Sequence, residues 1–381
     1  MSYSSLEVRP VINAAGALSR LGGSVLSLGV SEAMKLASQN FIDISFFHDR
    51  VGEELARITK NEGACISNGA AAGILVSVAA CLAGNDIELA AKLPNAKALE
   101  RSNVLVWRKH VDGFLAGADQ DLHNGYLSAV TMAGATLRII NEIDELQTSD
   151  AAMLWFPNVF PQVHNEEYFF DLFLNRARLL SIPFIVDAAD QIPPVSNLWY
   201  FTRDKGADLA IFSGGKGLKG PGSSGLIVGK TELIRACRVN SGPEHSIGRP
   251  AKVGKEEIAG LLKAVEEALA SDVLSDARKW HSVVDRWLME LAELKSLGVE
   301  LRKSLTSHSG QPIPRVILVL TFANNAIRDE IIDCLWKQNP SIAVLPEAGV
   351  GIALNPHMIQ NDEISLVSKA IVSAITAITQ K

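Results

Sequence analysis

The chain has 381 residues, of which 48% are hydrophobic, and it carries 36 Lys and Arg against 42 Asp and Glu, a net charge of −6. This length suits about two or three domains with a sizeable core. Because no run of about five or more like charges occurs, the composition argues against general binding to nucleic acid.

Neither the start of the chain nor its longest apolar segment has the features of export or membrane insertion. Glu7 and Arg9 stand where a signal peptide has its apolar region. The longest apolar stretch, residues 69–84, contains Gly73 and Ser77 and is shorter than the roughly 20 residues of a membrane span. The four cysteines and eight histidines follow no zinc-binding spacing. We therefore expect a cytoplasmic protein with reduced thiols, no metal and no membrane partner.

The first distinctive segment, residues 9–24, is too rich in glycine for a regular helix and is typical of a loop that lines a site. Arg20 in this segment is a candidate for binding a substrate anion, and an ordinary surface arginine is the alternative. Residues 31–60 then have mostly helical spacing.

A glycine turn opens the next helix. Residues 64–67 form a short apolar strand, and an apolar helix follows the turn. The unpaired N–H groups and the positive dipole end of such a helix suit a phosphate. We expect a phosphate group to bind at Ser67, Asn68, Gly69, Ala70 and Ala71, although many α/β proteins open a helix in this way.

Two later strands end in candidate polar side chains. Residues 103–107 predict a strand, and His110 follows it closely. Residues 183–187 form a β-branched and aromatic run that ends in Asp187, as in a buried parallel strand whose carboxyl end meets a ligand. Asp190 is the reserve candidate, and the alternative role for Asp187 is to cap a turn.

The segment DLAIFSGGKGLKGPGSSGLIVG, residues 208–229, places a glycine-rich loop between two apolar strands. Glycines allow a backbone to bend sharply and to approach a ligand closely. We therefore interpret Lys216 as a lysine that forms a Schiff base with an aldehyde, while Ser213 offers a hydroxyl to a phosphate. A solvated lysine in a glycine turn is the alternative.

Seven strands are predicted in the first two thirds of the chain, with helical or mixed connections between most of them. This pattern favours a mainly parallel, doubly wound α/β sheet. The last connection, residues 213–223, is too short for a crossover, so the strand at 224–228 is expected to be antiparallel. The seven strands span residues 64–67, 103–107, 136–140, 151–156, 183–187, 208–212 and 224–228.

The S-x-x-K spacing of Ser213 and Lys216 resembles that of fold-type-I pyridoxal-phosphate (PLP) enzymes. The strings SGGKGLKGP and IGRPAKVGKEEI are similar to the branch that contains selenocysteine synthase and D-glucosaminate-6-phosphate ammonia-lyase. The resemblance implies a large PLP-binding domain with an N-terminal segment over residues 1–245, a smaller α+β domain over residues 246–381, and a homo-oligomer.

The resemblance also implies roles for the candidate residues. PLP would form its Schiff base with Lys216, and Asp187 would face the pyridine nitrogen, because a protonated ring draws electron density from the substrate. His110 would stack on the ring, with a satisfied, partly buried histidine as the alternative. Arg249 would bind a carboxylate or phosphate near His245, or both residues would instead support an interface.

The implied reaction is a β-elimination on a small amino acid substrate. Lys216 would remove the α-proton from a 2-amino-3-hydroxy acid, such as a phosphorylated amino sugar acid, and the products would be a 2-oxo acid and ammonia. One alternative is a selenocysteine-synthase-like transferase on aminoacyl-tRNA, which needs basic clusters that this sequence lacks. Another is a PLP-fold protein that has lost its chemistry.

Overall fold

The computed structural model describes residues 3–95, 99–116, 120–158 and 165–380. It divides into two compact units, one of residues 24–271 and one that combines residues 1–23 with residues 272–381. The sequence predicted a boundary between residues 245 and 246, with residues 1–23 in the large domain and residues 246–271 in the small one. In the structure, residues 1–23 belong to the smaller unit and residues 246–271 to the larger unit.

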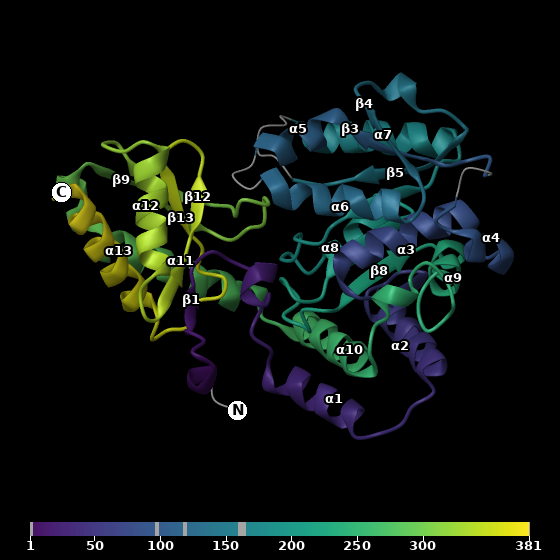
Figure 1. Ribbon diagram of the computed structural model, residues 1–381, viewed down its shortest axis with the longest axis horizontal. Helices are drawn as coiled ribbons and strands as arrows, with labels where there is room; N and C mark the ends of the chain where they lie inside the picture. The colour runs from purple at the N-terminus through teal and green to yellow at the C-terminus, as the bar shows by residue number, and fades with distance from the viewer. Residues whose placement is uncertain (1–2, 96–98, 117–119, 159–164, 381) are drawn as a thin grey trace. The chain divides into compact units, whose positions relative to one another are not determined.

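The larger unit is built on a seven-stranded sheet with the order β2-β8-β7-β6-β5-β3-β4. Strands β3, β4, β5 and β8 of this sheet are labelled in Figure 1. Strand β8 is antiparallel to both of its neighbours, and all other adjacent strands are parallel. The predicted α/β fold, including the antiparallel last strand, is confirmed. The strands are β2 (Gly63–Ser67), β3 (Asn103–Trp107), β4 (Thr136–Ile140), β5 (Asp150–Trp155), β6 (Phe184–Asp187), β7 (Leu209–Ser213) and β8 (Gly225–Gly229).

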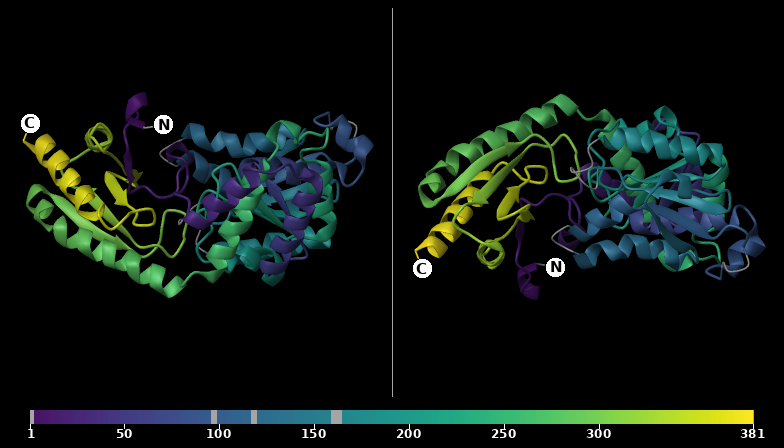
Figure 2. Two further views of the ribbon diagram at one scale, coloured as in Figure 1. Left: turned by 90° about the horizontal axis from the view of Figure 1, so that it is seen from below. Right: turned by 90° about the horizontal axis from the view of Figure 1, so that it is seen from above.

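Helices cover both faces of this sheet (Figure 2), and each face has its own apolar core. On one face Trp155, Phe184 and Phe212 pack with side chains of α2, α7 and α10. On the other face the sheet packs against α3, which is apolar nearly all round and therefore buried. The helices of this unit are α1 (Leu28–Ser38), α2 (Ile44–Ile58), α3 (Gly69–Ala83), α4 (Ile87–Lys92), α5 (Arg108–Ala116), α6 (Gln120–Met132), α7 (Glu166–Leu179), α8 (Asn197–Trp199), α9 (Thr231–Val239) and α10 (Lys255–Ala270).

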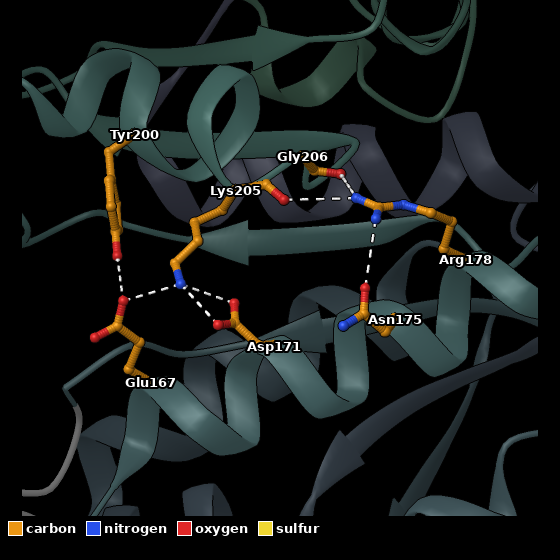
Figure 3. Close-up of polar contacts among 7 residues, drawn as sticks. All are labelled: Glu167, Asp171, Asn175, Arg178, Tyr200, Lys205 and Gly206. Atoms are coloured by element: carbon orange, nitrogen blue, oxygen red, sulfur yellow. Dashed lines mark hydrogen bonds and ion pairs between the residues drawn. The ribbon is translucent and has the colours of Figure 1, made fainter.

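The connection between β6 and β7 is fastened to α7 by the ion-pair network in Figure 3. The Lys205 ammonium lies 2.9 Å from Glu167 Oε1 and 2.8 Å from Asp171 Oδ1. Burial alone would lower the pKa of Lys205, but hydrogen bonds to the two carboxylates raise it above its ordinary value. Arg178 adds bonds to the Lys205 and Gly206 carbonyls. This network fixes the chain just before β7, the strand that leads to Lys216.

The smaller unit contains an antiparallel sheet with the order β12-β13-β10-β9 and a parallel pair of β1 with β11. Its helices pack on the sheet through a core that includes Trp287 and Ile371. None of the helices formed by the described residues has the length and apolar character needed to cross a bilayer. The elements are β1 (Val11–Asn13), α11 (Val273–Glu290), β9 (Val299–Ser304), β10 (Arg315–Leu320), α12 (Asn325–Trp336), β11 (Ser341–Ala343), β12 (Leu345–Glu347), β13 (Gly351–Leu354) and α13 (Ile364–Thr379).

Candidate active site

The carboxyl ends of β2, β6 and β7 meet at one edge of the large sheet. Ser67 and Ser213 each lie in register with Gly225, which therefore stands between them. Asp187 lies in register with Ile211, two residues before Ser213. Residues far apart in sequence are thus brought together at the edge where parallel α/β sheets bind ligands.

The first turn of α3 is open to an anion. Gly69 begins the helix with a φ of +78°, and a Cβ at this position would meet no atom within 4 Å. The Asn68 side chain does not cap the helix and instead donates to the Lys252 carbonyl at 3.1 Å. Ser67 donates its hydroxyl proton to the Gly69 carbonyl at 2.9 Å. The uncapped N–H groups and the space beside Gly69 fit a phosphate.

Glycine at position 225 is required for this turn to sit against the sheet. A Cβ at Gly225 would lie 2.6 Å from Ser67 Oγ and 2.6 Å from the Gly69 carbonyl carbon. Any larger residue would push the helix N-terminus away from β8, the strand that follows the Lys216 loop. The close contact therefore joins the phosphate-binding turn to the lysine loop.

Lys216 is half-buried in the loop between β7 and β8, and its environment is acidic. Burial lowers the pKa of Lys216, but attraction by Asp190, Tyr126 and Asp187 more than offsets this effect and raises the pKa. The amine therefore holds a proton firmly in the absence of a bound aldehyde. This coupling places Lys216 close to the aspartate that the sequence analysis selected.

Asp187 at the end of β6 has a carboxyl that takes up a proton unusually easily. Its Oδ1 accepts a hydrogen bond from the Ala189 N–H at 3.1 Å. Burial raises the pKa of Asp187 to about 6, against the lowering effects of this hydrogen bond and of Lys216. A carboxyl with such a pKa is suited to share a proton with a ring nitrogen, which is the partner that PLP would supply.

His110 lies in the first turn of α5, and its ring is buried. The ring makes edge contacts with Trp107 and Trp155, with centroids 5.4 and 4.4 Å away. Burial lowers the pKa of His110 to about 3, so the imidazole is neutral. Neither ring nitrogen has a hydrogen-bond partner among the described residues. A buried imidazole in this state fits a site that a ligand completes.

Sequence reasoning missed three residues near this edge. Tyr126 on α6 is one of the groups coupled to Lys216, and no sequence pattern marks it. Asn158, with a left-handed φ of 54°, donates its side-chain amide to Gln191 Oε1 at 3.0 Å. Gln191 in turn donates to the Pro157 carbonyl at 3.2 Å. Gln191 belongs to the DAADQIPP string, which is the signal that could have identified it.

The three predicted substrate-binding residues are all exposed. Arg20 lies in the short 3-10 helix Ser19–Leu21 of the smaller unit. His245 and Arg249 share the loop that precedes α10, and Arg249 donates to the Pro243 carbonyl in the same loop. Their roles in substrate binding stay predictions.

Comparison with known proteins gives two sequence relatives, whereas no family model matches the chain. The chain is 31% identical over 329 residues to 5'-C-glycyluridine monooxygenase-decarboxylase from Streptomyces sp., an alignment that covers 84% of this chain and 77% of that protein. It is 29% identical over 264 residues to D-glucosaminate-6-phosphate ammonia lyase from Salmonella typhimurium, with 69% of each chain covered.

Solved structures agree with the sequence relatives. D-Glucosaminate-6-phosphate ammonia-lyase superposes with a TM-score of 0.77 at 23% identity over 98% of both chains. Serine palmitoyltransferase from S. paucimobilis, solved with PLP and myriocin bound, gives a TM-score of 0.60 at 13% identity over 98% of this chain and 89% of that chain. These likenesses define the fold as that of the fold-type-I enzymes. The chain belongs to the PLP-dependent family of this fold, in the branch of its two sequence relatives, as its motifs predicted.

Proposed function

We propose that the protein is a PLP-dependent lyase that converts a 2-amino-3-hydroxy acid into a 2-oxo acid and ammonia. The observation that carries this proposal is that Asp187 at the end of β6, the Lys216 loop after β7 and the open N-terminus of α3 meet at one edge of the sheet. The three features supply an amine, an acid and an anion site for one small cofactor. The Salmonella relative, named as an ammonia lyase, supports this class of reaction.

The residues present fit PLP in distinct roles. With PLP bound, Asp187 would hold a proton at the pyridine nitrogen, and the neutral His110 ring would lie against the cofactor ring. Lys216 would bind the aldehyde carbon in the resting enzyme. The residues that would hold the phosphate are Ser67, Asn68, Gly69, Ala70, Ala71 and Ser213.

The proton transfers fall to Lys216. When bound, PLP withdraws electrons from the α-carbon of the attached amino acid. The neutral Lys216 amine takes the α-proton, and the nearby Asp187 and Asp190 stabilise the resulting ammonium. Lys216 then gives a proton to the departing 3-hydroxyl, which leaves as water. Hydrolysis of the remaining enamine consumes one water and releases ammonia, so the net change is loss of ammonia.

The substrate we propose is a phosphorylated amino sugar acid such as D-glucosaminate 6-phosphate, by analogy with the Salmonella relative. Such a substrate carries a carboxylate and a phosphate, and both need cationic partners. Arg20, His245 and Arg249 are the candidates for this binding. All three are exposed and therefore accessible to a ligand.

We also propose that the protein is a cytoplasmic homo-oligomer. Large apolar side chains are exposed on and around α1 and the start of α2: Val25, Leu28, Leu36, Phe41 and Phe46. Several exposed large apolar side chains within one segment are typical of a protein–protein interface. Size-exclusion chromatography with light scattering tests this: a Phe41→Ser variant is expected to shift toward monomer, and a wild-type monomer contradicts the proposal.

The function is tested on purified wild-type protein with PLP. An absorbance band from lysine-bound PLP, together with equal amounts of ammonia and 2-oxo acid from D-glucosaminate 6-phosphate, is the expected result. A panel of other 2-amino-3-hydroxy acids tests the substrate class. PLP binding without ammonia release from any member of the panel contradicts the lyase function.

A second candidate is oxygen-dependent decarboxylation. The Streptomyces relative, a monooxygenase-decarboxylase, matches a larger share of this chain at slightly higher identity than the ammonia lyase does. The two candidates differ in their co-reactant and products, because only the second consumes oxygen and releases carbon dioxide. Oxygen-electrode and carbon dioxide measurements with 5'-C-glycyluridine, repeated under anaerobic conditions, distinguish them.

A further inference from the structure

The loop that carries Lys216 contains one strained residue, and it is not a glycine. Residues 213–224 include five glycines, at positions 214, 215, 217, 220 and 222. None of these five has a left-handed φ, whereas Lys219 has a φ of +56°. An L-residue other than glycine adopts this conformation only at a cost.

Four of the five loop glycines, all except Gly222, are explained by close packing. A Cβ at Gly217 would lie 1.9 Å from the Ile192 carbonyl oxygen, and one at Gly214 would lie 2.0 Å from Ser224 Oγ. Backbone bonds also hold the loop, because Lys219 N–H donates to the Lys216 carbonyl at 2.9 Å and Gly220 N–H donates to the Gly214 carbonyl at 2.8 Å. The surrounding structure therefore imposes the left-handed conformation on position 219.

Lys60, the other lysine with a left-handed backbone among the described residues, has a partner for its ammonium. It follows the C-terminal end of α2 with a φ of +59°, and its ammonium lies 4.1 Å from the centroid of the Trp199 ring. Lys219 has no comparable contact. Its side chain is exposed and forms no ion pair, hydrogen bond or ring contact with any residue in the described part of the chain.

We propose that Lys219 binds a phosphate group of the substrate, at the end remote from the reacting amine. This inference rests on the proposed function and specifies its substrate class. The turn from Lys216 to Lys219 keeps their Cα atoms within about 7 Å of each other. The two amines can therefore reach two groups of one small molecule, Lys216 the reacting carbon and Lys219 an anion.

The negative charges around Lys216 favour such a cation. Asp187 and Asp190 lie close enough to Lys216 to raise its pKa, so they repel an anionic substrate that approaches the same amine. A flexible, exposed ammonium three residues away offsets that repulsion and suits a phosphate as a point charge. A glycine at position 219 would relieve the strain but would remove the charge.

The first test measures phosphate binding to PLP-loaded protein by calorimetry, with inorganic phosphate as the probe. Lys219→Gly is expected to bind the probe about 10- to 100-fold more weakly than wild type. Lys219→Arg should restore affinity to within a few fold. Lys60→Gly is the matched control, since it relieves the same backbone strain and should leave phosphate affinity unchanged.

The second test is selectivity, measured with D-glucosaminate 6-phosphate and D-glucosaminate. Lys219→Gly should raise KM for the phosphorylated substrate, with little change in kcat, and leave the unphosphorylated substrate unaffected. The thermal midpoint of this variant should be the same as that of wild type or higher by up to about 2 °C, because backbone strain is relieved. A loss that reflected unfolding would instead lower the midpoint.

Three outcomes decide whether Lys219 binds the substrate phosphate. Unchanged phosphate affinity in Lys219→Gly overturns the inference, even if the wild type releases ammonia. Dissociation of an oligomer in Lys219→Gly also overturns it, because the lysine would then serve a subunit contact. Conversely, phosphate binding that depends on Lys219 in a protein that releases no ammonia supports the inference and contradicts only the proposed lyase function.

Discussion

The amino and carboxyl edges of the large sheet both carry polar and charged side chains, but the two sets differ in how fully they are paired within the protein. At the amino edge, the fully buried Asp150 accepts hydrogen bonds from Arg138 at 3.1 Å and from Asn103 at 3.2 Å. Asp208 accepts from the Phe184 N–H at 2.7 Å and pairs with Lys230. Each of these carboxylates has strong partners within the protein.

At the carboxyl edge the polar groups are less well satisfied. Burial raises the pKa of Asp187 to about 6, and both nitrogens of His110 are without a partner among the described residues. Lys219 is exposed and strained. The difference teaches that paired groups at the amino edge stabilise the strands, whereas groups at the carboxyl edge keep their hydrogen-bonding capacity for a ligand.

Replacing one lysine at each edge should show the functional difference between the two edges most clearly. Lys216→Ala is expected to lower kcat by about 10³-fold or more, because it removes both the covalent attachment and the proton carrier. Lys230→Ala, at the amino edge, should leave kcat unchanged. Ammonia release and PLP absorbance measure both effects, and a Lys216→Ala enzyme with substantial turnover would refute the assignment.

Loss of a carboxylate at the amino edge should affect stability and not catalysis. Asp150→Ala leaves Arg138 and Asn103 without their buried acceptor and is expected to lower the free energy of unfolding by about 2–4 kcal/mol. Urea unfolding measures this change. If the folded variant instead lost turnover while keeping its stability, the contrast between the edges would fail.

The pH dependence of the PLP-free protein should reveal Asp187. Its pKa is 3.8 ordinarily and about 6 in the native state, so the native protein binds more protons than the unfolded chain between these values. This contribution lowers stability as pH rises from about 4 to about 6. Above that window, Asp187→Asn should be more stable than wild type by about 3 kcal/mol.

Two buried histidines change the free energy of unfolding with pH in the opposite direction. The effect of Asp187 must therefore be isolated by comparing wild type with Asp187→Asn. Burial lowers the pKa of His48 and of His110 to about 3, so their contributions to stability are present above pH 6.5 and are lost as pH falls toward 3. Urea unfolding of wild type and Asp187→Asn across pH 4–8 isolates the aspartate. A difference in unfolding free energy that is constant with pH would contradict its raised pKa.

The smallest expected effect concerns the Lys205 network outside the sheet (Figure 3). Lys205→Met should cost about 1 kcal/mol, because the ammonium pairs with two partly exposed carboxylates. Thermal unfolding measures this loss, with unchanged kcat as the control. A larger decrease in kcat than in stability would indicate that the network acts on the site through β7.

The sequence by itself predicted the seven strands and the candidate lysine and aspartate. Apolar runs bounded by glycine and polar residues identify buried strands locally, and Lys216 and Asp187 stand at their ends. The antiparallel direction of β8 followed from the length of one connection, because an 11-residue glycine loop cannot make a parallel crossover. These features depend on residues close together in the chain.

Only the tertiary structure decided which distant groups meet. Strand register set Ser67 and Ser213 on either side of Gly225, and helix packing brought Tyr126 near Lys216. It also showed that the loop glycines serve close packing while Lys219 takes the left-handed conformation. Such facts depend on contacts between segments far apart in sequence, and local composition does not encode those distances.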